Sequence, residues 1–595
     1  MTSEFFDRRD LDFLLFELLG VERLTQLPRF AEHSRETFAA VLDNAEKIAG
    51  ELFAPHNRKA DEHEPQFDGA SVQLIPEVKQ ALDAFSAAGF ISASCDEEQG
   101  GMQLPFSVWM ACSAIFKAAN ISTEAYALLT AGAANLLRTF GTTEQKARYL
   151  PSMLAGRWFG TMVLTEPQAG SSLGDITTSA RKNADGKYSI RGAKIFISAG
   201  DHEITENIVH FVLARIEGAP PGVKGISLFI VPKYRVNADG SRGARNDVAL
   251  AGLIHKMGFR GTTSTMLNFG ERGECVGELI GPAHQGLACM FQMMNEARIG
   301  VGLGAAALGV AGYRHSLAYA RERPQGRHGK DAGSPQVPII EHADVRRMLL
   351  AQKAYAEGAL ALCLYAACLS DLHQHAQSAS DREDAALLLD LLTPVVKAWP
   401  SDFCLEANSL AIQIHGGYGY TREYPVEQIY RDNRLNPIHE GTNGIQALDL
   451  LGRKVVAAEG KGLELLGREI ATTVASAREH GGELQQHAQV LETAWQQLGE
   501  TTRVIAASLA ADARRGLANA GPYLTTFGHT VVAWLWLRQA LVGARHEAGP
   551  EADFYRGKLA AARYFFRWEL PRAQVAHERL RELDKTWLDV EPQWF

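Results

Sequence analysis

The segment of this chain with the clearest chemical potential carries a carboxylate beside a glycine. Residues 431–434 read RDNR and lead into residues 438–446, which read IHEGTNGIQ. Glu440 falls at the expected junction between a loop and a helix, where a carboxylate can reach into a cleft and accept a proton. The same pattern also fits a plain helix start, because Glu followed by Gly-Thr-Asn can begin a helix without any chemistry.

Two further segments have the composition of a site for a flat, phosphorylated ligand. Residues 165–172 (TEPQAGSS) follow a predicted strand and supply hydroxyls and backbone N–H groups that can hold a flavin edge and a phosphate. Residues 194–200 (KIFISAG) end another strand, where Phe196 offers a flat apolar wall and Ser198 a hydroxyl, as a flavin requires. Taken singly, the first segment is equally an ordinary polar loop, and for the second a strand end with one core phenylalanine is favoured.

A glycine-rich segment, residues 413–420 (QIHGGYGY), follows a predicted helix. Glycines let the backbone approach a ligand closely. Glycines also end helices, so a helix C-terminus with a glycine cap is the alternative. His415 is by itself equally compatible with a structural histidine.

The composition of the whole chain is that of an ordinary multidomain globular protein. The chain has 595 residues, of which 46% are hydrophobic and 22% are charged, and this length is too great for one core. Its net charge of -9 argues against nucleic-acid binding, which usually requires a basic domain or stripe. The seven cysteines form no Cys-x-x-Cys pair, so we expect no disulfide framework and no metal site, and a reducing compartment fits best.

Nothing in the hydropathy pattern predicts export or a membrane span. The N-terminal sequence is acidic and lacks the basic start of a signal peptide. Residues 358–370 form the longest apolar stretch and are fewer than the roughly 20 that cross a bilayer, so a cytoplasmic location is expected. The aromatic residues at 564–568 and the run VVAWLWL at 531–537 suit either a membrane-surface helix or a helical core. We favour the core, and therefore do not expect membrane contact.

The predicted elements run in the order helices, strands, helices, which indicates an α+β fold. We expect an N-terminal helical domain (1–159), a central β domain (160–283), a C-terminal helical bundle (284–458) and a helical extension (459–595). Helical spacing and β-branched runs predict strands at 160–164, 188–198, 208–216 and 226–232, and helices at 78–88, 108–137, 146–154, 287–320, 340–372, 384–413 and 445–458. Residues 237–246 are expected to form a loop. The pairs Gly481-Gly482 and Gly521-Pro522 should separate three or four helices in the extension.

Five motifs occur in order along residues 40–455. They are Thr-Glu-Pro-x-Ala-Gly-Ser, Lys-Ile-Phe-Ile-Ser, Arg-x-Gln-Gly, Gln-Ile-x-Gly-Gly-x-Gly and Tyr-Pro-Val-Glu followed by Arg-Asp and Glu-Gly-Thr. Together they resemble the acyl-CoA dehydrogenase family, and the long tail resembles its larger members, which include long-chain and methylthiopropionyl-CoA enzymes. The resemblance implies a helical N-terminal domain, a central β domain and a four-helix bundle with FAD between them, plus an extra C-terminal helical domain.

The resemblance also implies the site residues, with Glu440 as the catalytic base. The implied FAD-binding residues are Met162, Leu164, Thr165, Gly170, Ser171, Phe196, Ser198, Arg323, Gln413, Gly416, Gly417, Thr442 and Gly444. The implied substrate-binding residues are Ser171, Arg298 and Gly441. Phe196 and Ser198 depart from the Trp and Thr that the family often has there.

Some members of the family place the base in the first long helix after the β domain. Here the residue just before Arg298 is Ala297, which cannot accept a proton. Glu296 is one residue away, about 100° around a helix. Glu440 is therefore favoured, and Glu296 is its rival.

The implied reaction is FAD-dependent α,β-dehydrogenation of an acyl-CoA thioester to the trans-2-enoyl-CoA. Glu440 takes the α-proton, the β-hydrogen leaves as hydride to flavin N5, and an electron-transfer flavoprotein takes the electrons. We expect a medium- to long-chain fatty acyl-CoA. We also expect a homo-oligomer, because the segments of Arg323 and Gln413 resemble those that reach the FAD of a partner chain. A homodimer is expected because, in many of the larger members, the tail occupies the surface that smaller members use to form a tetramer. The alternatives are a methylthiopropionyl-CoA dehydrogenase, an acyl-CoA oxidase, or a catalytically silent flavin-binding scaffold.

Overall fold

The structure is a computed structural model that describes residues 4–328 and 333–595, except for the side chains of residues 291–295. Contacts divide the chain into two compact units. The sheet unit comprises Glu36–Pro105 and Ile115–Ala297, and the helical unit comprises Met1–Arg35, Phe106–Ala114 and Arg298–Phe595. The division passes within two long helices, α5 (Phe106–Phe140) and α7 (Gly286–Glu322). The four domain boundaries expected from the sequence stay a prediction.

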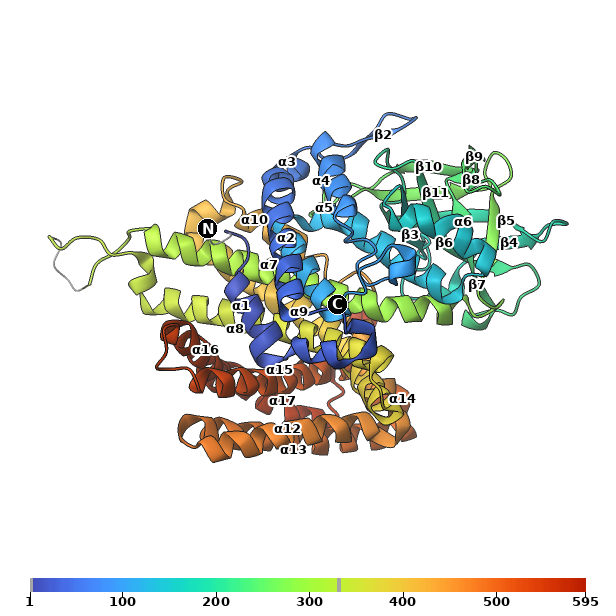
Figure 1. Ribbon diagram of the computed structural model, residues 1–595. Coiled ribbons are helices and arrows are strands. Elements are labelled where there is room, and N and C mark those ends of the chain that lie inside the picture. The colour runs from blue at the N-terminus through green and yellow to red at the C-terminus, as the bar shows by residue number, and fades with distance from the viewer. Residues whose placement is uncertain (1–3, 329–332) are drawn as a thin grey trace. The chain divides into compact units, whose positions relative to one another are not determined.

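The sheet unit contains an eight-stranded sheet (Figure 1). Its pairing order is β10-β11-β5-β12-β7-β6-β3, and β4 pairs with both β5 and β6. The pairings from β5 through β12, β7, β6 and β4 therefore return to β5, so this part of the sheet closes on itself. Its strands are β3 (Trp158–Val163), β4 (Ser179–Lys182), β5 (Tyr188–Ser198), β6 (Asn207–Ile216), β7 (Ile226–Pro232), β10 (Val248–Leu253), β11 (Ser264–Phe269) and β12 (Val276–Ile280).

The strand predictions are confirmed with shifts of a few residues at most. Strands β6 and β7 are buried almost throughout, which explains their continuous apolar sequence. The loop expected at 237–246 was partly wrong, because β9 (Arg242–Arg245) pairs with β8 (Tyr234–Val236). Strand β9 buries no apolar face, so its sequence gives no alternating pattern. A second small pair joins β1 (Gln66–Phe67) to β2 (Val72–Gln73).

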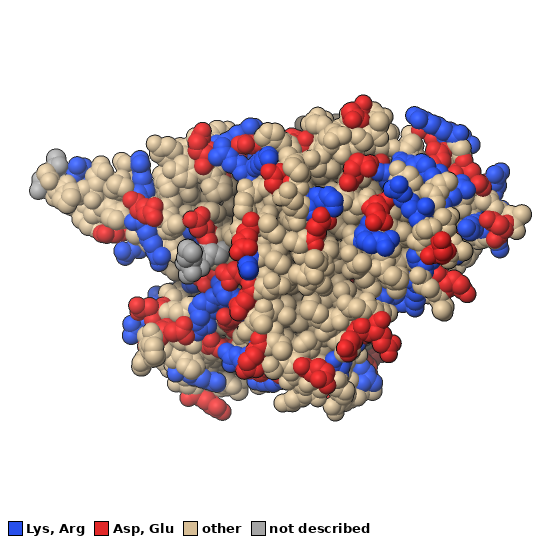
Figure 2. Space-filling model, turned by 45° about the horizontal axis from the view of Figure 1, so that its top comes forward, with Lys and Arg blue, Asp and Glu red and all other residues tan. Residues whose placement is uncertain are grey.

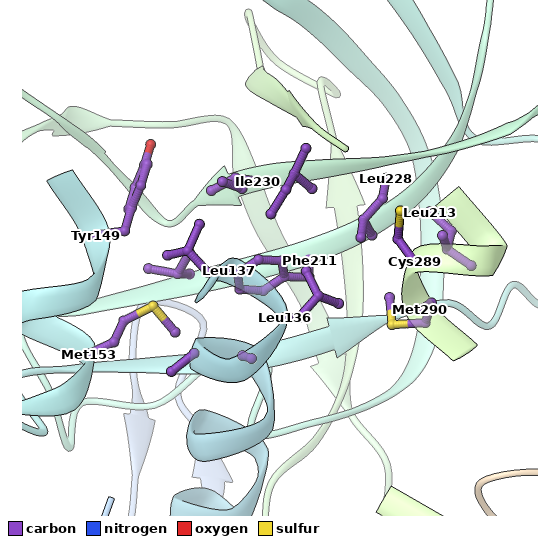
Figure 3. Packing of buried hydrophobic residues seen from close by; sticks show 14 of the residues in the cluster. Leu136, Leu137, Tyr149, Met153, Phe211, Leu213, Leu228, Ile230, Cys289 and Met290 are labelled. Atoms are coloured by element: carbon purple, nitrogen blue, oxygen red, sulfur yellow. The ribbon is translucent and has the colours of Figure 1, made fainter. Parts of the chain in front are cut away.

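Helices α5 and α6 (Thr143–Leu154) bury apolar side chains against this sheet. Leu137 from α5 and Met153 from α6 lie in one buried cluster with Phe211 of β6 (Figure 3). Helix α6 begins at Thr143, three residues before the predicted start at 146, because Thr142 and Gln145 form a capping box. Other cluster members in that view are Leu136, Tyr149, Leu213, Leu228, Ile230, Cys289 and Met290. The unit's remaining helices are α2 (Arg35–Ile48), α3 (Asn57–Glu62) and α4 (Pro76–Ala87).

The helical unit is built around α8 (Ala343–His375) and α9 (Ala379–His415), which pack along each other. Two short helices follow, α10 (Val426–Asn433) and α11 (Asn443–Asp449), and they flank the segment that carries Glu440. The helix predicted at 445–458 is shorter as an α-helix, because α11 passes into a π-helical turn at Leu450–Lys454. The first helix of this unit is α1 (Arg8–Asp12).

The C-terminal extension packs onto these helices through α15 (Ala520–Ala544), which contacts α8 and α9 as well as α12 (Lys461–His480) and α13 (Gly482–Ala511) (Figure 1). The run VVAWLWL at 531–537 is completely buried in α15, which confirms core packing. Its other helices are α14 (Ala513–Leu517), α16 (Ala552–Tyr564), α17 (Leu570–Glu582) and α18 (Thr586–Asp589).

The count of three or four helices in the extension was wrong, because five helices there have 13 or more residues. The pair Gly521-Pro522 lies in the first turn of α15, where proline is tolerated, so it marks a helix start. The pair Gly549-Pro550 lies in the break between α15 and α16, and the prediction passed over it.

Among the described residues, α8 alone is long and apolar enough to cross a membrane. In the structure 89% of its apolar window is buried, as in the core helix of a folded domain. On the molecular face in Figure 2, acidic and basic side chains are interspersed over the surface.

Candidate active site

The turn that carries Glu440 is held in an unusual backbone conformation by one buried side chain. Glu440 has φ +53° and Gly441 has φ +86°, in the left-handed region that glycine tolerates and glutamate rarely adopts. The amide of Gln446 donates to the carbonyl oxygens of both residues, at 3.3 and 3.2 Å. Thr442 caps α11 by accepting a hydrogen bond from the N–H of Ile445. The helix start expected in this segment is confirmed, with Thr442 as the cap, and Glu440 precedes it in a strained turn. The role of Glu440 as a base stays a prediction.

Two cations lie in the electrostatic environment of Glu440. Burial raises the pKa of this carboxyl, while the charges of Arg298 on α7 and Lys397 on α9 oppose the rise. Arg298 is itself buried and pairs with Asp449 at 3.2 Å, and Asp449 also binds Arg453 at 2.8 Å. The buried Nε of Arg298 has no hydrogen-bond partner among the described residues. The predicted base and the predicted substrate-binding arginine thus belong to one cluster.

The sequence reasoning missed Lys397, which contributes to the same cluster. Its side chain is completely buried, and its ammonium donates to the side-chain oxygen of Asn443 at 2.9 Å. The amide nitrogen of Asn443 donates in turn to Asp402 at 2.7 Å and to the carbonyl of Ala398 at 3.3 Å. The signal was present in the sequence, since a lysine interrupts the apolar run LLTPVVKAW.

Glu296, the rival base, lies in the sheet unit and has a different role in the structure. The amide of Asn135 donates to both of its carboxylate oxygens, at 2.9 and 2.8 Å. Burial raises the pKa of Glu296 to about 7, against opposing effects of Asn135 and Arg138. A carboxyl with such a pKa can exchange protons near neutral pH, so Glu296 needs an experimental comparison with Glu440.

The predicted flavin loop in the sheet unit is anchored by a residue that the sequence reasoning did not single out. Burial favours the neutral form of Glu166, but the charge of Lys194 and hydrogen bonds from Thr177 and Thr178 outweigh it and hold the pKa of Glu166 at about 2. The N–H of Ile195 on β5 donates to the carbonyl of Thr165 at 3.0 Å. The start of the loop is therefore fixed to the end of β5.

The predicted residues near the anchored part of the loop are more buried than those beyond it. Met162 and Leu164 are half-buried and pack against the core of the sheet unit. Thr165 is half-buried, whereas Gly170 and Ser171 are exposed beyond the anchored part. Gly170 also has open space where a side chain would project. The loop therefore presents exposed polar groups next to half-buried apolar side chains, as a flavin edge requires.

A β-bulge turns Phe196 out of the sheet beside this loop. The register between β5 and β11 shifts near Phe196, which has φ +59°. Its ring is 61% exposed, which is unusual for so large an apolar side chain in a strand. Ser198, two residues on, is exposed on the same side of the strand. An exposed aromatic ring next to hydroxyl donors fits the flat ring system of a flavin.

The two segments expected to reach the FAD of a partner chain lie together in the helical unit. The guanidinium of Arg323 lies over the ring of Tyr418, 5.5 Å from its centre. Tyr319 stacks on His415 at 4.3 Å, and Tyr424 packs against both rings. His415 is thus a structural residue that joins the ends of α7 and α9. The predicted residues Gln413, Gly416 and Gly417 are exposed beside this aromatic cluster.

Comparison with known proteins finds four domain families in succession along the chain. Residues 35–157, 161–271 and 284–455 match the N-terminal, middle and C-terminal domains of acyl-CoA dehydrogenase, and residues 466–591 match the domain described as acetyl-CoA dehydrogenase C-terminal like. A 3-methylmercaptopropionyl-CoA dehydrogenase of Ruegeria pomeroyi is 37% identical over 96% of this chain and 97% of its own. The chain belongs to the acyl-CoA dehydrogenase family. It is an enzyme of that family and a flavoprotein whose cofactor is FAD.

Other relatives of this acyl-CoA dehydrogenase cover its whole length. The broad-specificity linear acyl-CoA dehydrogenase FadE5 of Mycobacterium tuberculosis is 36% identical over 99% of both chains. In fold, the protein is similar to Caenorhabditis elegans ACDH-11, solved in complex with C11-CoA, with a TM-score of 0.79, 20% identity and coverage of 98% of this chain and 96% of that one. The expected fold class, with the additional C-terminal helical domain, is confirmed.

The predicted site residues of this acyl-CoA dehydrogenase are distributed over both units. Phe196, Ser198 and residues 162–171 lie in the sheet unit, whereas Glu440 and the segments around Arg323, Gln413 and Thr442 lie in the helical unit. Gly444 is exposed in the first turn of α11. Within each unit these residues supply an aromatic wall, hydroxyl donors or cationic groups that fit FAD. Their individual roles stay predictions.

Proposed function

We propose that Glu440 is the base of this acyl-CoA dehydrogenase and removes the α-proton of the thioester. The observation that supports this assignment is its carboxyl in a strained, glycine-flanked turn, half-buried near two cations. Such strain persists at functional sites, where surrounding contacts hold it. The raised pKa brings the carboxyl closer to the working pH, as a general base requires.

The residues of the chain itself then carry out the proton transfer of the reaction. The C–H bond at the α-carbon breaks, and the proton moves to the carboxylate of Glu440. FAD, when bound, would supply the acceptor for the hydride lost from the β-carbon, so the product would be the trans-2-enoyl-CoA. The N–H of Glu440 is the donor that we assign to the thioester oxygen, where negative charge develops, and one such donor contributes about 3–4 kcal/mol.

We assign the substrate to the class of unbranched acyl-CoA thioesters, with a medium- to long-chain fatty acyl group as the first candidate. The name of the mycobacterial relative, a broad-specificity linear acyl-CoA dehydrogenase, supports this class. Methylthiopropionyl-CoA is the second candidate, supported by the Ruegeria relative. Electron transfer to an electron-transfer flavoprotein, a homodimer and a cytoplasmic location complete the proposal.

The deciding experiment is an anaerobic titration of the purified protein, followed by the loss of its yellow colour. Palmitoyl-CoA, butyryl-CoA and methylthiopropionyl-CoA are added in turn to wild type, Glu440→Gln and Glu296→Gln. Wild type and Glu296→Gln should bleach, and Glu440→Gln should lose rate by about 100- to 10,000-fold while it stays yellow. The ester that bleaches the wild type fastest identifies the substrate class.

Other outcomes of this titration point elsewhere. Bleaching of Glu440→Gln together with loss of bleaching in Glu296→Gln would transfer the role of base to Glu296. A yellow wild type that no ester bleaches would favour the flavin-binding scaffold. Rapid hydrogen peroxide formation in air with substrate would indicate an acyl-CoA oxidase.

A further inference from the structure

Lys397 is a buried lysine that forms no ion pair with any of the residues that the structure describes, and it lies next to the segment that carries Glu440. We propose that Lys397 is a positioning residue for the base: through Asn443 it fixes the turn of Glu440, and its charge stabilises the ionised carboxylate. This inference rests on the assignment of Glu440 as the base.

The other buried lysines of the chain show what is unusual about Lys397. Each of them has a carboxylate oxygen within 3.0 Å of its ammonium; these are Lys117, Lys194, Lys233 and Lys558. Among the described residues, Lys397 is the buried lysine for which no such pair exists, and its side-chain hydrogen bond goes to the neutral amide oxygen of Asn443. A buried ammonium that contacts no carboxylate directly is costly, so packing alone does not account for a lysine at this position.

The contact with Asn443 connects α9 directly to the catalytic turn. Asn443 is the first residue of α11 and lies three residues after Glu440. Its side chain binds α9 at three points, since it accepts from Lys397 and donates to Asp402 and to the carbonyl of Ala398. The start of α11 therefore cannot move away from α9 without breaking these bonds. Together with Gln446, this anchor fixes both ends of the short segment that follows the base.

The charges around Lys397 come from three elements. Asp402 on α9 and Glu440 favour its charged form, whereas burial and Arg298 on α7 oppose it, and the pKa of Lys397 falls to about 8. The effect is mutual, because the same ammonium lowers the pKa of Glu440. Removal of the charge should therefore raise the pKa of the base, and the charge itself should be lost as the pH rises through about 8.

The test compares pH profiles of kcat and kcat/KM for the FAD-loaded wild type, Lys397→Met, Lys397→Arg and Asn443→Ala. The acidic limb of each pH profile reports the pKa of the base. In Lys397→Met we expect this limb to move up by about one pH unit, with kcat about 10-fold lower and KM little changed. Lys397→Arg keeps the charge, so its acidic limb should stay with the wild type. Asn443→Ala keeps the lysine, so kcat should fall without a shift of the limb.

Lys558→Met is the matched control, because it removes another completely buried lysine from the helical unit. It should lower the unfolding temperature and leave the acidic limb in place. If Lys397→Met shows the same behaviour, Lys397 is merely structural and the proposal is overturned. If Lys397→Met does not fold, hydrogen exchange of residues 438–447 in Asn443→Ala decides: faster exchange supports the anchor, and wild-type exchange with wild-type kcat overturns it.

These outcomes are distinct from a failure of the proposed function. If Glu440→Gln keeps full activity, the assignment of the base fails regardless of any variant at position 397. If Glu440→Gln is inactive and Lys397→Met retains the wild-type pH profile, the base is supported and the positioning role of Lys397 is overturned.

Discussion

The ammonium of Lys194 lies 3.0 Å from the carboxylate of Glu166, and both side chains are almost completely buried. Lys194 belongs to β5, and Glu166 belongs to the loop in which flavin-binding residues are predicted. The same ammonium donates to the carbonyl of Leu164 at 2.8 Å. The loop is therefore held on β5 by a charged pair and by a hydrogen bond to its own backbone.

Removal of either Glu166 or Lys194 should leave the charge of the other side chain buried and without a partner. We expect Glu166→Gln to lose about 3–5 kcal/mol of unfolding free energy, measured by urea denaturation, and to retain less FAD after purification. Lys79→Met is the matched control, because it breaks an exposed pair with Asp83 in the same unit and should cost less than about 1 kcal/mol. Equal losses in the two variants would contradict the anchoring role.

Phe196 provides a test of cofactor binding that is separate from folding. Its ring is 61% exposed, so Phe196→Ala should change the stability of the apoprotein by about 0.5 kcal/mol or less. If the ring packs on the flavin, its loss should weaken FAD binding about 10-fold, measured by fluorescence titration of the apoprotein. Val223→Ala, at a residue 51% exposed in the same unit, should leave FAD affinity unchanged. An unchanged affinity in Phe196→Ala would remove this residue from the flavin site.

Gly441 adjoins the base in a conformation that a side chain would disturb. A Cβ there would lie 2.7 Å from the amide nitrogen of Gln446, which holds the turn, and the φ of +86° adds strain. We expect Gly441→Ala to reduce kcat about 10- to 100-fold in the flavin-bleaching assay. Gly499→Ala is the control, because a Cβ on α13 meets nothing within 4 Å and should stabilise the helix slightly. Full activity of Gly441→Ala would show that the turn tolerates displacement.

Features that depend on neighbouring residues could be predicted from the sequence, whereas features that depend on the packing of distant segments could not. Strands β5 and β7 match their predicted bounds because alternation or an apolar run between Gly and Pro marks them directly. The turn of Glu440 could be predicted from neighbouring residues, since a glycine and a helix cap accompany it, and its role as the base stays a prediction. Lys397 was missed because it precedes Glu440 by 43 positions in the sequence and joins it only through the packing of α9 against α11. Glu166 was read as part of a polar motif, because its pairing with Lys194 requires the sheet to form.

Asp371 predicts a dependence of stability on pH. Its buried carboxylate accepts hydrogen bonds from the N–H groups of Phe106 and Ser107 at 2.7 and 2.9 Å, and burial raises its pKa from 3.8 to about 6. Because the folded state then binds the proton more tightly than the unfolded state, this group stabilises the fold below about pH 4, and the contribution is lost as the pH rises through about 6.

Comparison of wild type with Asp371→Asn isolates this contribution. The stability of the wild type relative to the variant should fall by about 3 kcal/mol between roughly pH 4 and pH 7, as measured by urea unfolding at each pH. A difference that stays constant over this range, or that grows with pH, would contradict the raised pKa of Asp371.

Gly528 tests whether the extension is part of the core of the helical unit. It lies on α15, and a Cβ there would come within 2.5 Å of the ring of Trp399, which is completely buried on α9. Because neither the ring nor α15 has room to shift, Gly528→Ala should cost about 1–3 kcal/mol and lower the unfolding temperature of the whole unit in one transition. Gly521→Ala is the matched control, since it lies in the first turn of the same helix with open space around it and should be neutral or slightly stabilising. If Gly528→Ala instead splits unfolding into two transitions, or leaves it unchanged, the extension folds as a domain separate from α8 and α9.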